Sequence, residues 1–167
     1  MTMRKSHFAA AALAAAALAG SGARAQPIET HESISYEGAK QILDTCAALA
    51  KTKGWTVAIW VLGADGQPVA FAATKGVTPT GIKTARWKAE TAFSTGAPSG
   101  ARVASLATAE GAYTTQALGM FPVSGGLPLK QDGQLIGAVG VGGAKPQNGV
   151  SFDEICAQAG IDATFKK

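Results

Sequence analysis

Histidine, cysteine and long apolar runs are scarce in this chain of 167 residues. It holds two histidines and two cysteines. No apolar run reaches the roughly 18 residues that a membrane-spanning helix requires. Cys46 and Cys156 are too far apart for a CxxC motif. Once the predicted N-terminal signal peptide described below is removed, the chain keeps too few Cys and His residues for a four-ligand zinc site. A transmembrane helix and a structural zinc site are therefore not expected.

The sequence motifs of several enzyme classes are also missing. There is no G-x-S-x-G serine elbow, no Rossmann fingerprint and no Walker A pattern. The run Gly140-Val141-Gly142-Gly143 follows a predicted strand as a phosphate-binding loop does, but Pro146 blocks an immediate helix. A nucleotide site is therefore not expected, and no pair of carboxylates has a spacing that indicates acid–base catalysis.

The first 25 residues have the layout of a secretory signal peptide. A basic start is followed by an apolar stretch and by Ala23-Arg24-Ala25, which predicts cleavage before Gln26 and a periplasmic or secreted protein. The alternative is an alanine-rich first helix of the fold. Cleavage leaves 12 basic residues against 11 acidic ones, although the whole chain carries a formal charge of +4. A nearly neutral mature chain gives no reason to bind nucleic acid or anionic lipid.

The rest of the chain reads as alternating helices and hairpins. Apolar residues at helical spacing, N-cap residues, β-rich runs and Asp-Gly turns mark the elements. Residues 108–120 fit no single pattern. The pattern predicts a helix from Ser35 to Gly54, a hairpin of 55–62 and 68–72, helices over 80–93 and 98–107, a hairpin of 127–130 and 134–141, and a helix capped by Ser151.

This order predicts an α+β fold. Hairpins make antiparallel neighbours, so the expected sheet is mainly antiparallel, built from two hairpins and flanked by helices. The predicted organisation is a signal peptide over 1–25, a polar leader over 26–33 and a single domain over 34–167. Glycines at 137 and 140 inside a strand indicate a close approach by another backbone or a ligand.

The two cysteines fall on the apolar stripes of the first and last predicted helices. In an oxidising compartment an even pair of cysteines is a disulfide candidate, so Cys46 and Cys156 are expected to be bonded if those stripes lie side by side. The alternative is two buried free thiols that pack as small apolar residues.

The candidate ligands for a metal or haem iron are few. His31 is the one histidine after the predicted cleavage site, and it lies in the leader, where a solvated side chain is the alternative. Tyr113, with Met120 and Tyr36 as further candidates, supplies another type of axial ligand. For each of these the alternative is a packing residue.

The second predicted helix carries a cationic face. Arg86 and Lys88 flank its apolar stripe and could meet the carboxylates of an acidic ligand, such as haem propionates. Arg86 could equally form an i,i+4 ion pair with Glu90. Trp87 lies on the polar face, as expected for a subunit contact, or for a ring that packs beneath a lysine stem.

The glycine and proline spacing resembles that of the GlcG/HbpS family of haem-binding-like proteins. The resemblance covers about residues 34 to 163. It departs from the family at Gly142, where many relatives have serine, and at Cys156, where alanine is common. The matching residues are Ile82, Ala85, Lys88-Ala89, Thr91-Ala92, Phe121-Pro122, Gly125-Gly126, Pro128, Gly133, Ile136 to Val141, Gly143, Asp153-Glu154, Ala157 and Ala159-Gly160.

The resemblance implies a profilin-like sandwich of an antiparallel sheet with helices, assembled into a homo-oligomer. It implies an exported protein that binds a small ligand, with haem as the candidate, although no haem ligand transfers by position. The alternative is a small-molecule enzyme with a pocket beside the FPVSGG (121–126) and GVGG (140–143) segments. The predicted ligand-binding residues are Arg86, Lys88, Tyr113, Gly125, Gly126, Gly142 and Gly143, with His31 as the metal ligand.

Overall fold

A computed structural model describes residues 31–166, so the predicted signal peptide and most of the leader lie outside the described residues. The fold is α+β, as predicted. Its elements in chain order are α1 (Tyr36–Lys53), β1 (Ala58–Gly63), β2 (Pro68–Ala73), α2 (Pro79–Thr95), the 3-10 helix η1 (Ser99–Ala107), α3 (Ala109–Ala117), β3 (Gly126–Gln131), β4 (Gln134–Gly142) and α4 (Phe152–Phe165).

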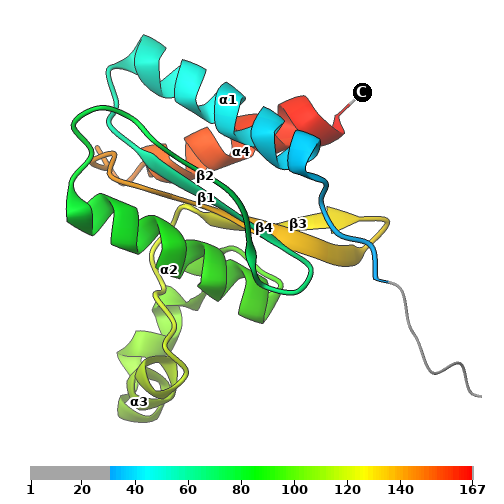
Figure 1. The fold of residues 1–167 in the computed structure, drawn as a ribbon. Helices are drawn as coiled ribbons and strands as arrows, with labels where there is room; N and C mark the ends of the chain where they lie inside the picture. The colour runs from blue at the N-terminus through cyan, green and yellow to red at the C-terminus, as the bar shows by residue number, and fades with distance from the viewer. Residues whose placement is uncertain (1–30, 167) are drawn as a thin grey trace, which may run out of the picture. The chain divides into compact units, whose positions relative to one another are not determined.

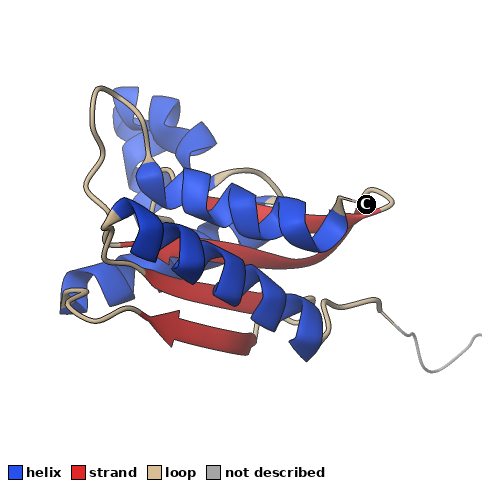
Figure 2. Ribbon diagram, turned by 90° about the horizontal axis from the view of Figure 1, so that it is seen from above, coloured by secondary structure: helices blue, strands red, loops and turns tan. Residues whose placement is uncertain are grey.

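The sheet has four antiparallel strands in the order β2-β1-β4-β3. Each predicted hairpin forms one half of it, and pairing of β1 with β4 joins the halves at the centre. Helices α1 and α4 cover one face, and α2 covers the other (Figure 1). Figure 2, which looks from above, shows helices lying over the strands on the face that α1 and α4 cover. The helices η1 and α3 project from the α2 side as an arm.

Local capping explains where the main helices begin and end. The Ser35 hydroxyl accepts a hydrogen bond from the amide of Gly38 at 3.1 Å, and Gly54 ends α1 in the left-handed conformation with φ of 70°. Helix α2 begins one residue before the predicted Thr80, because Thr78 is its N-cap and Pro79 its first residue. Residues 98–107, predicted as a helix, form the 3-10 helix η1, and the undecided segment 108–120 contains α3.

Glycines in β4 allow α2 to contact the sheet backbone. A Cβ atom on Gly140 would lie 2.1 Å from the Ala85 carbonyl oxygen, and one on Gly142 would lie 2.5 Å from that of Gly81. Both distances are far below van der Waals contact. The close approach that the sequence indicated at Gly140 is therefore made by a helix of the same chain.

The apolar core lies between the sheet and the pair α1 and α4. It includes Ile42, Ile59 and Val139, each fully buried. Cys46 of α1 and Cys156 of α4 are joined by a disulfide with a Cα–Cα distance of 4.8 Å. The apolar stripes of the two helices thus lie side by side. Among the described residues, no helix combines the length and the apolar character that a bilayer crossing demands.

Candidate functional site

A cavity of about 320 Å³ opens where α2, η1 and the start of α4 meet. This volume is at the lower end of the range for small-molecule sites, about 300–1,000 Å³. The cavity lies beside the FPVSGG segment and directly after the GVGG segment. Its lining residues are Lys88, Gly100, Val103, Pro122, Val123, Ser124, Ala144, Pro146, Gly149, Ser151 and Asp153.

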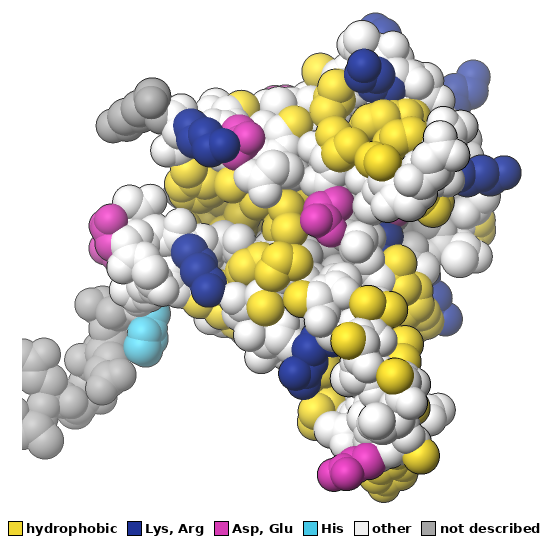
Figure 3. All heavy atoms as spheres, turned by 180° about the vertical axis from the view of Figure 1, so that it is seen from behind, with side chains coloured by type: hydrophobic (Ala, Val, Ile, Leu, Met, Phe, Trp, Pro, Cys, Tyr) yellow, Lys and Arg dark blue, Asp and Glu magenta, His cyan; other side chains and the backbone are white. Residues whose placement is uncertain are grey.

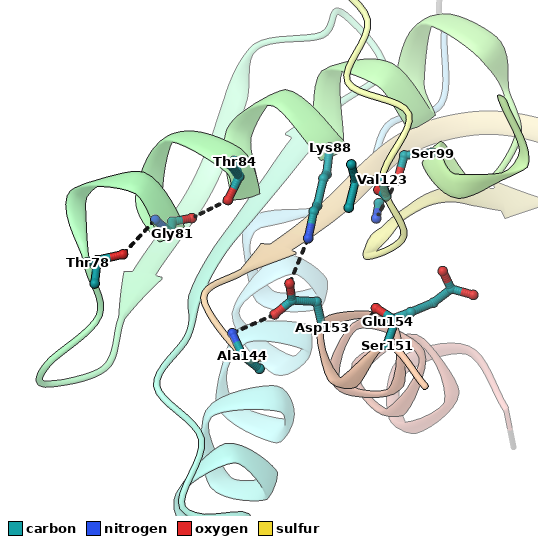
Figure 4. A network of polar contacts seen from close by, with 11 residues as sticks. Thr78, Gly81, Thr84, Lys88, Ser99, Val123, Ala144, Ser151, Asp153 and Glu154 are labelled. Atoms are coloured by element: carbon teal, nitrogen blue, oxygen red, sulfur yellow. Dashed lines mark hydrogen bonds and ion pairs between the residues drawn. The ribbon is translucent and has the colours of Figure 1, made fainter. Parts of the chain in front are cut away.

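A buried ion pair forms the polar end of this cavity. The Lys88 Nζ atom lies 2.7 Å from Asp153 Oδ2, and the two side chains are only 5% and 8% exposed. The other carboxylate oxygen of Asp153 accepts a hydrogen bond from the Ala144 amide at 3.0 Å (Figure 4). The pair therefore links α2, the loop after β4 and the first turn of α4.

Burial raises the pKa of the Asp153 carboxyl group above its ordinary value. The low dielectric around a buried carboxylate disfavours its charged form, and this effect outweighs the Lys88 ammonium and the backbone amides that favour it. Asp153 is thus a carboxyl group that accepts a proton more readily than an exposed aspartate does.

Hydrogen bonds from α2 and η1 hold the FPVSGG wall of the cavity in place. The Ser99 hydroxyl donates to the Val123 carbonyl at 2.6 Å and accepts from the Gly126 amide at 2.9 Å. The Thr91 hydroxyl oxygen accepts from the Phe121 amide at 2.8 Å. Since these bonds tie the wall to two helices, the cavity is formed before any ligand enters it.

Gly125 and Gly126 end the FPVSGG segment and are not among the residues that line the cavity. Gly125 has φ of 122°, and a Cβ there would come within 3.0 Å of Lys88 Nζ and 2.7 Å of Asp153 Cβ. A Cβ on Gly126 would lie 2.1 Å from the Lys88 carbonyl oxygen. Because neither glycine has a side chain, the Lys88 side chain and the Lys88 backbone can lie directly against them.

Other predicted ligand residues lie elsewhere. Gly142 and Gly143 pack against Gly81 of α2 and do not line the cavity. Arg86 is exposed and pairs with Glu90 at 2.7 Å, which is the ordinary i,i+4 interpretation of that residue. Arg86 and Lys88 were both predicted to bind a ligand, and of the two only Lys88 lines the cavity.

Trp87 is half-buried and packs within its own chain. Its ring lies 5.5 Å from that of Phe121, and the Lys83 ammonium lies 4.9 Å from its centroid. This corresponds to the alternative interpretation, an aromatic ring beneath a lysine stem.

The predicted axial ligands lie on the surface. Tyr113 on α3 is 73% exposed. His31 is also exposed, and the histidine side chain is visible on the surface in Figure 3. Neither residue lines the cavity. No group of three or more His, Cys, Asp or Glu side chains that could hold a metal ion occurs within residues 31–166.

The sequence interpretation missed Asp153. The pattern places Asp153 and Glu154 together in the acidic first turn of the last helix, where Ser151 indeed accepts a hydrogen bond from the Glu154 amide at 3.3 Å. Asp153 instead points inward to a lysine 65 residues earlier in the chain. The sequence signal that could have indicated such a partner was the position of Lys88 beside the apolar stripe of its helix. A lysine that is buried there requires a counter-charge.

The α+β fold and the spacing of the glycines are shared with a known family of proteins. A family model described as "Haem degrading protein HbpS-like" matches residues 34–162. The chain belongs to this HbpS-like family. A comparison with curated protein sequences gave no match.

Solved structures share the fold over most of the chain. A double mutant of Streptomyces reticuli HbpS is 25% identical, with 92% of this chain and 97% of that chain covered and a TM-score of 0.72. Klebsiella pneumoniae protein ORFY is 20% identical, with 86% and 98% covered and a TM-score of 0.74. A structure described as a PduOC:Heme complex is 22% identical, with 78% and 94% covered and a TM-score of 0.70.

Proposed function

We propose that this protein is an exported small-ligand-binding protein of the HbpS type and that haem is a ligand. The observation that carries the proposal is the family match over residues 34–162, which spans nearly all of the described domain. A structural neighbour described as a haem complex adds support.

The positions of the donor residues support a haem site on the surface rather than in the cavity. The cavity lining contains no His, Cys, Met or Tyr, which are the usual protein ligands of haem iron. The cysteines are joined to each other. His31, Tyr36 and Tyr113 are exposed and carry atoms of the kind that ligate haem iron, so we propose that haem contacts one of these side chains. When bound, haem would supply an iron centre, and the protein would supply the axial ligand and contacts to the ring.

A haem at the surface would be shielded from solvent by a second copy of the chain, so we include a homo-oligomer in the proposal. Exposed apolar side chains on the projecting arm support this contact, and hydrophobic atoms lie along the arm in Figure 3. Large exposed apolar groups of this kind are enriched at protein interfaces. The arm residues concerned are Leu106, Tyr113 and Leu118, which do not line the cavity.

Titration of the mature protein with haem tests the proposed function. A Soret band that shifts from that of free haem is expected, with saturation at a fixed ratio of haem to chain. His31→Ala and Tyr113→Phe identify the axial ligand, because loss of the ligating group changes the band position. Tyr36→Phe tests the third exposed donor in the same way, and the variants that leave the band unchanged serve as controls for the one that shifts it. Sedimentation of the same samples should give the mass of an oligomer, and an unchanged free-haem spectrum at the monomer mass contradicts the proposal.

Export is the part of the proposal that rests on the sequence before Gln26. The oxidising compartment that it implies agrees with a bonded Cys46–Cys156 pair. Mass spectrometry of the soluble protein from its native host should find an N-terminus at Gln26 in the periplasmic or secreted fraction. A soluble cytoplasmic product that keeps Met1 contradicts export and leaves the haem proposal standing.

A further inference from the structure

We propose that the cavity at Lys88 and Asp153 binds a short aliphatic monocarboxylate, with its carboxylate on the Lys88 ammonium and its alkyl chain against the apolar wall. This site is separate from the proposed haem site, since the exposed haem donors do not line the cavity. The test below uses no haem, so the two proposals can fail independently.

The Lys88 ammonium has the capacity to receive the carboxylate. An ammonium carries three N–H donors, and Asp153 is its one hydrogen-bond partner among residues 31–166. Gly125 keeps the space beside Nζ free of a side chain. Ser151, the N-cap of the 14-residue helix α4, also lines the cavity, and the positive end of a helix favours an anion. A charged donor with unused N–H groups therefore faces a cavity with a favourable field.

The apolar part of the cavity lining suits an alkyl chain. Val103 comes from η1, Pro122 and Val123 come from the FPVSGG segment, and Pro146 comes from the loop after β4. These side chains carry no polar groups that would require a partner. The small volume and the single ammonium favour a compact ligand with one acidic group.

Charge balance favours a monoanion over phosphate. Lys88 and Asp153 are the charged side chains in the lining, and together they are neutral. Arg102 of η1, Lys145 of the loop and Glu154 of α4 line different hollows. The charged residues Lys83, Arg86 and Glu90 of α2 do not line the cavity either. A bound carboxylate would place two like charges at one ammonium. One carboxyl group must then take up a proton, as in other pairs of carboxylates that share a site.

Calorimetric titration with isovalerate tests the site. We expect saturable binding of one isovalerate per chain with uptake of about one proton, measured from the heats in two buffers of different ionisation enthalpy. Isovaleramide, which has the same alkyl chain but no charge, should bind about tenfold more weakly or worse. Inorganic phosphate and acetate, which lack the alkyl chain, should also bind at least about tenfold more weakly than isovalerate.

A pair of matched variants locates the binding. Val103→Trp fills the apolar side of the cavity and should weaken isovalerate binding about tenfold or more. Ile155→Trp makes the same kind of change at an exposed position of α4, outside the cavity lining and outside the proposed contact between copies, and should leave the affinity unchanged. Both positions are exposed, so neither change opens the core. The proposal is overturned if isovalerate gives no binding heat, if isovaleramide binds as tightly, or if both variants bind as the unchanged protein does.

Discussion

Replacing Lys88 by methionine is expected to lower the free energy of unfolding by about 3–5 kcal/mol, because Asp153 would remain buried without its counter-charge. The pair is among the least exposed polar contacts in the domain, with side chains 5% and 8% exposed. Chemical denaturation gives the free energy of unfolding, and thermal denaturation should show a fall in Tm of about 10–20 °C.

Two further variants separate the missing counter-charge from lost packing. The double variant Lys88→Met with Asp153→Asn removes both charges, while the carbonyl of the new amide side chain can still accept from the Ala144 amide, so most of the lost stability should return. Arg86→Met removes a cation from an exposed pair on the same helix and should cost less than about 0.5 kcal/mol. A double variant as unstable as Lys88→Met would contradict a buried, charged pair.

Loss of the disulfide should have a comparable effect. Exchanging both Cys46 and Cys156 for alanine is expected to lower the free energy of unfolding by about 2–5 kcal/mol. The bridge spans 110 residues, and chain entropy alone predicts about 4.7 kcal/mol for a loop near this size, as an upper figure. Reduction of the unchanged protein should lower its stability to a similar extent.

Thiol chemistry provides the control for this prediction. The unfolded, unreduced protein should contain no reactive thiol, since the chain has only these two cysteines. The alanine variant should unfold identically with and without a reducing agent. Two reactive thiols per chain in the unreduced protein would mean that the residues are buried but not bonded.

Local sequence signals predicted most of the fold because local interactions form it. Ser35 and Gly54 delimit α1 through hydrogen bonds within a few residues, and the Asp-Gly turns delimit both hairpins. The segment 98–120 was harder to predict. Gly111 and Gly119 interrupt helical periodicity in its second half, and most of its residues are exposed, so few of its apolar side chains mark a buried face.

The candidate site was less predictable because it depends on a contact between distant segments. The sequence marks Lys88 as a cation beside an apolar stripe, but its partner lies 65 residues later, where the local pattern indicates an acidic residue of a helix start and no buried contact. Gly142 and Gly143, which were predicted to contact a ligand, lie against the backbones of α2 and Thr56. A glycine pattern shows that something approaches the backbone closely, and it does not show what approaches.

The glycine contacts between α2 and β4 set a spacing that extends to the cavity. Lys88 lies one residue before Ala89, whose amide nitrogen would be 2.4 Å from a Cβ on Gly140. A side chain at position 140 would clash with the backbone of α2 and displace this helix from the sheet. The Lys88 ammonium would then move away from the start of α4. The position of the Lys88–Asp153 pair therefore depends partly on Gly140, which has no side chain and does not line the cavity.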